Sequence, residues 1–142
     1  MNYKINNNRA THITVSRKAI KHNLQRVRDL VPNASIMAVI KANGYGHNIL
    51  EVANALGDAN EFAVTDLDDV ALLRANGVNK QVTMLSSRFD TDDLNVMAEQ
   101  NVRPVIYDFD QLNQVAKLSE QANLDVWIKV CLLYTSPSPR DS

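Results

Sequence analysis

The residue with the clearest potential for chemistry is Lys41, which follows the apolar run Ile36–Ile40 and precedes the turn-forming pair Asn43-Gly44. A short apolar run closed by turn residues is typical of a strand buried on both faces, so the lysine is expected at the strand's carboxyl end, between core and cleft. Burial disfavours an ammonium group, and the neutral amine is the form that attacks a carbonyl to make a Schiff base. The alternative is a structural lysine that extends its charge into water.

The heptapeptide Lys41-Ala-Asn-Gly-Tyr-Gly-His47 closely resembles the pyridoxal-phosphate lysine signature of alanine racemases. The resemblance implies that Lys41 holds the cofactor covalently and acts as one catalytic base, and that Tyr45 contacts the cofactor phosphate. Leu85 matches a family position that lines the cofactor ring, although a plain core leucine would explain it equally well. The family usually has glycine after the histidine, where this chain has Asn48, a residue suited to cap the next helix.

The function implied by this resemblance is a pyridoxal-phosphate-dependent isomerase that interconverts L-alanine and D-alanine for the cell wall. It further implies alanine as the small-molecule partner and a homodimer in which the partner subunit supplies the base on the opposite face. Three alternatives stay open: a non-catalytic pyridoxal-phosphate-binding barrel that carries or regulates the cofactor, a racemase of broader amino-acid range, and a barrel aldolase that uses Lys41 without cofactor.

The elements that position Lys41 recur along the chain. Strand-like runs begin near residues 36, 61, 82, 103 and 125, about 21 to 25 residues apart, with helical patterns between them. This cadence predicts βαβ units and a parallel sheet, but does not separate an open sheet from a barrel. No Gly-x-Gly-x-x-Gly follows the first strand, which weakens a dinucleotide-binding interpretation. The resemblance favours an α/β fold that is a partial (β/α)8 TIM-type barrel, about the first five strand-helix units of eight.

Helix boundaries are predicted from side chains that can cap a first turn. The expected caps are Ser16, Asn48, Asp66, Thr91 and Asp108. A short entry strand is expected at 12–15. The helix after Thr91 should bury Leu94, Met97 and Ala98, and the helix after Asp108 should bury Leu112, Val115 and Ala116. In the strand 102–107, pairing is expected to begin at or after Pro104, because proline cannot donate to a ladder.

The fifth strand, 124–130, alternates between apolar and polar residues. If Lys41 faces the barrel interior, the polar set that includes Trp127 and Lys129 faces it too. Some alanine racemases carry a carbamate-modified lysine at the position that matches Lys129. A structural lysine is the favoured interpretation here, because the arginine that such a carbamate orients has no counterpart in this chain.

Composition restricts the remaining classes of function. A net charge of −1 over 142 residues gives no electrostatic case for nucleic acid or an anionic membrane surface. No apolar run has transmembrane length, and residues 1–9 lack the apolar core of a signal peptide, so a cytoplasmic location is expected. The acidic run Asp66–Asp69 is interpreted as a helix N-terminus, and no metal site is expected.

The domain organisation is expected to change near Cys131, the single cysteine. We interpret residues 1–130 as the N-terminal part of an alanine racemase cofactor-binding barrel. Residues 131–142, with Pro137 and Pro139, resemble a translated sequencing adapter and are expected to be a non-native, disordered read-through tail. The C-terminal β domain that the resemblance implies is expected to lie outside these residues, so the chain by itself is expected to be inactive.

Overall fold

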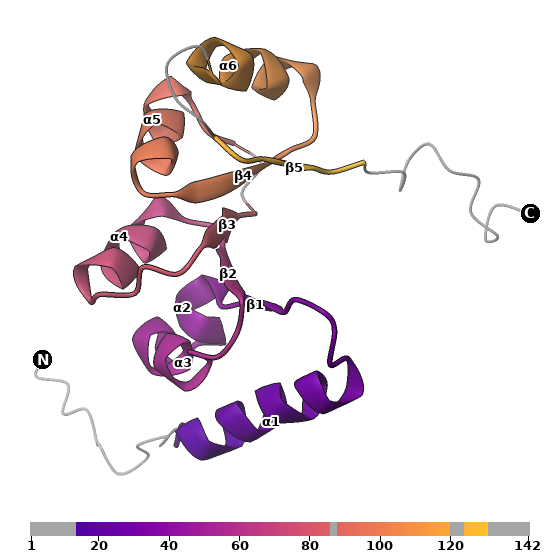
Figure 1. Ribbon diagram of the computed structural model, residues 1–142. Helices are drawn as coiled ribbons and strands as arrows, with labels where there is room; N and C mark the ends of the chain where they lie inside the picture. The colour runs from indigo at the N-terminus through magenta and orange to yellow at the C-terminus, as the bar shows by residue number, and fades with distance from the viewer. Residues whose placement is uncertain (1–13, 86–87, 120–123, 131–142) are drawn as a thin grey trace, which may run out of the picture.

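The computed structural model describes residues 14–85, 88–119 and 124–130, in which helices and strands alternate (Figure 1). The expected entry strand lies partly outside these ranges, and its described residues, Thr14 and Val15, are not in a strand. The tail 131–142 lies wholly outside them. The elements are α1 (Arg17–Leu30), β1 (Met37–Val39), α2 (Lys41–Tyr45), α3 (Ile49–Ala55), β2 (Glu61–Val64), α4 (Leu67–Ala75), β3 (Val82–Met84), α5 (Thr91–Glu99), β4 (Val102–Ile106), α6 (Phe109–Ser119) and β5 (Trp127–Ile128).

The five strands form one parallel sheet in the order β1-β2-β3-β4-β5. Ala38 is paired with Phe62, Phe62 with Val82, and Val82 with Val102. A doubly wound sheet reverses its strand order at a switch point. In this sheet each strand instead lies beside its sequence neighbour, with α2 to α5 on one side of the strands (Figure 1). The predicted α/β fold and partial barrel are confirmed.

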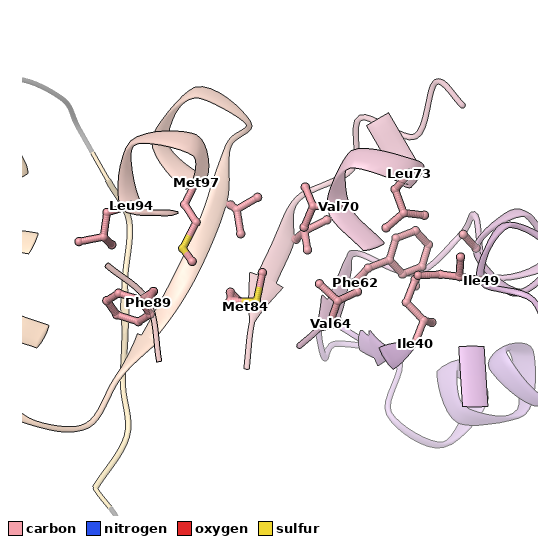
Figure 2. Packing of buried hydrophobic residues seen from close by; sticks show 14 of the residues in the cluster. Ile40, Ile49, Phe62, Val64, Val70, Leu73, Met84, Phe89, Leu94 and Met97 are labelled. Atoms are coloured by element: carbon pink, nitrogen blue, oxygen red, sulfur yellow. The ribbon is translucent and has the colours of Figure 1, made fainter. Parts of the chain in front are cut away.

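The core lies between the sheet and its helices. Phe62 and Ile40 have no exposed surface, and they pack with Ile49 of α3 and Leu73 of α4 (Figure 2). Met84 continues this layer toward the α5 residues Leu94 and Met97, which are buried as predicted, whereas Ala98 is only partly buried. Fully burying one such side chain contributes about 1.5–3 kcal/mol. The apolar layer therefore holds the carboxyl ends of β1 to β3 in place.

Most of the predicted helix caps are confirmed. Ser16 Oγ accepts from Ala19 N, Asp66 Oδ1 from Asp68 N, and Asp108 Oδ1 from Gln111 N at 2.8 Å. Thr91 was the wrong choice for α5, because the preceding acid competes better for the position. Asp90 accepts from Asp93 N at 2.9 Å and its own N–H donates to the Asp93 carboxylate at 3.0 Å, a reciprocal capping box.

The strand β4 begins earlier than predicted. Pairing starts at Val102, and Pro104 lies inside the ladder opposite Met84. Ile106 O accepts from Lys129 N at 2.7 Å, so the even-numbered residues of β4 direct their backbone groups toward β5. The β4–β5 register begins only at Val105, so the N–H that Pro104 lacks falls where no ladder bond is made.

The buried face of α6 differs from the predicted one. Val115 is buried as expected, but Leu112 and Ala116 are exposed, and Gln111 and Leu118 are buried instead. Gln111 Oε1 accepts from Tyr107 N at 3.0 Å, which gives the buried polar side chain a hydrogen-bond partner. Within the described ranges, no helix is long and apolar enough to cross a bilayer.

Candidate functional site

The segment after β1, labelled α2, is not a right-handed helix but a left-handed turn. The sequence predicted only an ordinary turn here. Ala42, Asn43, Gly44 and Tyr45 have φ values of 52, 53, 64 and 53°, and Gly46 follows at 80°. L-residues with a side chain pay roughly 1–2 kcal/mol for this conformation, whereas glycine does not. The pair Asn43-Gly44 and Gly46 suit it, but neither Ala42 nor Tyr45 signals it in the sequence.

Local hydrogen bonds hold the left-handed turn. Gly44 N donates to Ile40 O at 2.9 Å, and Gly46 N donates to Ala42 O at 3.0 Å. Asn43 Oδ1 accepts from Ile49 N at 2.9 Å, which ties the turn to the first residue of α3. Strained backbone that its surroundings over-determine in this way is concentrated at functional sites.

The predicted cap of α3 is confirmed and closes the same segment. Asn48 Oδ1 accepts from Leu50 N at 3.1 Å and from Glu51 N at 3.3 Å. His47 Nδ1 lies 3.1 Å from Gly44 O, so the last residue of the motif folds back on the turn. The substitution of the family's glycine by Asn48 therefore preserves the start of the helix.

The turn places Lys41 and Tyr45 at the carboxyl end of β1. Lys41 is partly buried and Tyr45 is 58% exposed. None of the ion pairs among the described residues involves Lys41. The carboxyl ends of the strands are where (β/α)8 enzymes build their sites, so both residues follow the end of the strand at which a site is expected.

Leu85 lies at the same end of the sheet. It directly follows β3, its N–H donates to Val64 O at 2.8 Å, and its side chain is 37% exposed. A plain core leucine would be buried like Met84, the residue before it, which is 1% exposed. The exposed position is compatible with a residue that lines a cleft.

Alternate strand residues face away from the helices. Sequence reasoning placed Trp127 on this face but missed the polar groups that β2, β3 and β4 contribute to it. This interior polar cluster consists of Glu61, Thr83, Arg103, Asp125 and Trp127. The Thr83 hydroxyl donates to Glu61 Oε1 and accepts from Trp127 Nε1 at 3.1 Å. Arg103 Nη2 lies 3.0 Å from Asp125 Oδ2, and Nη1 lies 3.5 Å from Glu61 Oε2.

The interior polar cluster confirms that Trp127 faces the interior, as its strand alternation predicted. Lys129, two residues further, is exposed and shares this face by alternation. The signal that could have revealed the cluster is the repeated polar residue at odd positions of β2, β3 and β4. In the part of the chain that the structure describes, no group of three or more His, Cys, Asp or Glu residues is placed to hold a metal.

A parallel sheet wound in sequential order, with helices between its strands and a lysine after the first one, defines an α/β protein that forms part of a (β/α)8 barrel. Residues 15–132 match the model of the protein family described as "Alanine racemase, N-terminal domain". The chain belongs to this family.

Individual relatives agree with the family. The biosynthetic alanine racemase of Escherichia coli K12 is 38% identical over 121 residues, which cover 85% of this chain and 34% of that protein. The chain thus spans about a third of the length of the curated relatives it matches. The alanine racemase of Acinetobacter baumannii superposes with a TM-score of 0.79 at 30% identity, covering 86% of this chain and 37% of that one. A histidine racemase from Leuconostoc mesenteroides superposes with a TM-score of 0.68 at 26% identity, covering 78% and 30%.

Proposed function

We propose that this chain forms the cofactor-binding part of a pyridoxal-phosphate-dependent racemase that interconverts L-alanine and D-alanine. The observation that carries the proposal is Lys41, an amine without an ion-pair partner in the described residues, at the carboxyl end of the first barrel strand. Membership of the alanine racemase family supports the same reaction.

The side chains at this end of the sheet fit pyridoxal phosphate. The cofactor aldehyde requires a primary amine, which Lys41 provides at the boundary between core and solvent. The phosphate requires hydrogen-bond donors, and the left-handed turn presents the Tyr45 hydroxyl close to Lys41 in the chain. Leu85 offers apolar surface for the ring.

Each of these residues has a distinct role in the proposed reaction. When bound, the cofactor supplies an electron sink for the carbanion formed at the substrate Cα. The Lys41 amine takes or returns the Cα proton on one face. Tyr45 fixes the phosphate, and Leu85 restricts the tilt of the ring. Racemisation also needs an acid-base group on the opposite face, which we assign to a partner subunit in a homodimer.

We expect the 142 residues, assayed by themselves, to racemise alanine poorly. The chain spans 34% of its E. coli relative, so most of such a protein has no counterpart in it. Loss of one catalytic acid or base commonly costs about 10²–10⁴-fold in rate. A version completed after Val130 with the corresponding part of the E. coli relative is therefore the form in which to measure turnover.

A racemase of broader range is the second candidate. The structural neighbour from Leuconostoc mesenteroides is a histidine racemase, so this fold is not restricted to alanine. Comparison of L-alanine, L-serine and L-histidine as substrates of the full-length gene product separates the two candidates, because the completed chimera takes most of its residues from the E. coli relative.

The test of the proposed function is Lys41→Ala in the completed protein. D-alanine formation and the cofactor's visible absorbance should both be lost, because no amine remains at the strand end. Lys18→Ala, an exposed lysine on α1, is the matched control and should retain both. Borohydride reduction followed by peptide mapping should find the pyridoxyl group on Lys41. A pyridoxyl group on another lysine would contradict the assignment.

A further inference from the structure

The interior polar cluster connects strands that backbone bonds hold only weakly. β5 has two residues, Trp127 and Ile128, paired with Val105 and Ile106. The bond from Trp127 Nε1 to Thr83 Oγ1 passes over β4 and ties β5 to β3. The position of the indole therefore depends on Thr83 as much as on the ladder.

Glu61 determines which way the Thr83 hydroxyl points. Both residues are buried, with Thr83 1% and Glu61 8% exposed. A hydroxyl has one proton to donate and lone pairs to accept. Because that proton is donated to Glu61, a lone pair is left for the indole N–H. Arg103 Nη1, 3.5 Å from Glu61 Oε2, restrains the carboxylate from its other side.

The sheet register places the backbone of Trp127 level with the Lys41 site, and its indole reaches back to Thr83, one row nearer the start of the strands. Val39 pairs with Ala63, Ala63 with Thr83, and Thr83 with Arg103. Two residues after these, just beyond the ends of β1, β2 and β3, come Lys41, Thr65 and Leu85. The corresponding residue of β4 is Val105, which pairs with Trp127. In an eight-stranded barrel the first and fifth strands lie on opposite sides, and their inward side chains meet across the interior.

We propose that Trp127 is a positioning residue that forms the wall of the site opposite Lys41, and that Glu61 and Thr83 hold its indole there by a two-step hydrogen-bond relay. This inference rests on the proposed function for the identity of the site, but the relay is independent of it. A wall held by a buried relay keeps the space in front of Lys41 constant, so that the cofactor ring enters in one orientation.

The test compares Thr83→Val, which removes the hydroxyl at similar volume, with Thr83→Ser, which keeps it. Trp127 is the only tryptophan of the chain, so its near-ultraviolet circular dichroism and its quenching by acrylamide report on this indole alone. Thr83→Val should weaken the dichroism and increase the quenching, and Thr83→Ser should resemble the parent. In the completed protein, Thr83→Val should weaken pyridoxal phosphate binding about fivefold, the value of one hydrogen bond.

The wall is tested through energy transfer. A pyridoxyl group reduced onto Lys41 absorbs where tryptophan emits, so it should quench Trp127 in the parent chain and less in Thr83→Val. An unchanged Trp127 spectrum in Thr83→Val would overturn the relay. Unquenched Trp127 in a chain with the pyridoxyl group on Lys41 would overturn the wall. A pyridoxyl group found elsewhere would overturn the proposed function and the wall together, while the dichroism still decides the relay.

Discussion

The two faces of the sheet differ in chemistry although the same strands make both. Toward the helices, β2 and β3 present Phe62, Val64, Val82 and Met84, each at most 1% exposed. Toward the interior, the same two strands present Glu61 and Thr83 together with the small Ala63. One face is held by apolar packing and the other by specific hydrogen bonds.

The difference between the two faces indicates which of them determines stability and which determines the geometry of the site. Apolar packing is tolerant of sequence, since many residues of similar volume fill the same space. A hydrogen-bond relay needs particular atoms at particular distances, and removal of one partner leaves the other unsatisfied. We therefore expect substitutions on the helix side to change the free energy of unfolding most, and those on the interior side to change the site.

The largest expected effect is that of Phe62→Ala, on the helix face. Removal of a fully buried phenylalanine should lower the free energy of unfolding by about 3–5 kcal/mol. Val39→Ala is the matched control on the interior face, where Val39 is 40% exposed and should cost much less. Urea denaturation followed by far-ultraviolet circular dichroism measures both. Equal losses would show that the two faces do not differ as described.

A smaller loss is expected for Gly44→Ala, where the left-handed turn meets the helix layer. A Cβ at this position would lie 2.9 Å from Val52 Cγ2 and at a φ of +64°, so it adds a clash to the conformational cost. We expect a loss of about 2–3 kcal/mol. Gly46 also has a left-handed backbone, but a Cβ added there would meet no atom within 4 Å. Gly46→Ala should therefore cost only about 1–2 kcal/mol. The clash is disproved if both variants unfold at the same urea concentration.

On the interior face, Glu61→Ala should cost about 1–3 kcal/mol, because it leaves the buried Thr83 hydroxyl without an acceptor. Glu61→Gln keeps an oxygen at this position and should lose less. Thermal unfolding of the two variants measures the difference. If they are equally unstable, the charge opposite Arg103, rather than the hydrogen bond, is what the site requires.

The smallest expected effect is a gain of stability on the helix side. Burial raises the pKa of Asp69 above its ordinary 3.8, and Asp66 and Asp68 raise it further. A carboxyl with a raised folded pKa stabilises the fold below its unfolded pKa, and that contribution is lost as pH rises through the folded value. Asp69→Asn should therefore raise the melting temperature at pH 7. The corresponding gain in the free energy of unfolding should be less than about 1 kcal/mol. At pH 3 the two proteins should melt together, and a gap that persists there would contradict this origin.

The fold could be predicted because apolar residues recur along the chain at the spacing of strands and helices. The runs around Phe62, Val82 and Val102 indicate buried strands, and their spacing indicates helical crossovers. Periodicity does not reveal competition between neighbouring polar groups. For this reason Asp90 rather than Thr91 caps α5, and Gln111 rather than Leu112 enters the core.

The site could be predicted only in part. Lys41 and Tyr45 were found through a motif, and the structure places them at one strand end. The handedness of the turn was missed because Ala42 and Tyr45 prefer right-handed conformations, and hydrogen bonds such as that from Ile49 N to Asn43 Oδ1 impose the other. The relay was missed because alternation assigns a side chain to a face without naming its partner.

The left-handed turn beside Lys41 has a stereochemical consequence. Ala42, at φ 52° and ψ 51°, adopts dihedral angles that are the mirror image of those an L-residue prefers. A D-alanine built into this exposed position by chemical synthesis would adopt them without strain. The backbone next to the proposed base therefore holds an L-alanine in the geometry natural to its enantiomer, at the same end of the barrel where we propose that the two enantiomers of free alanine are exchanged.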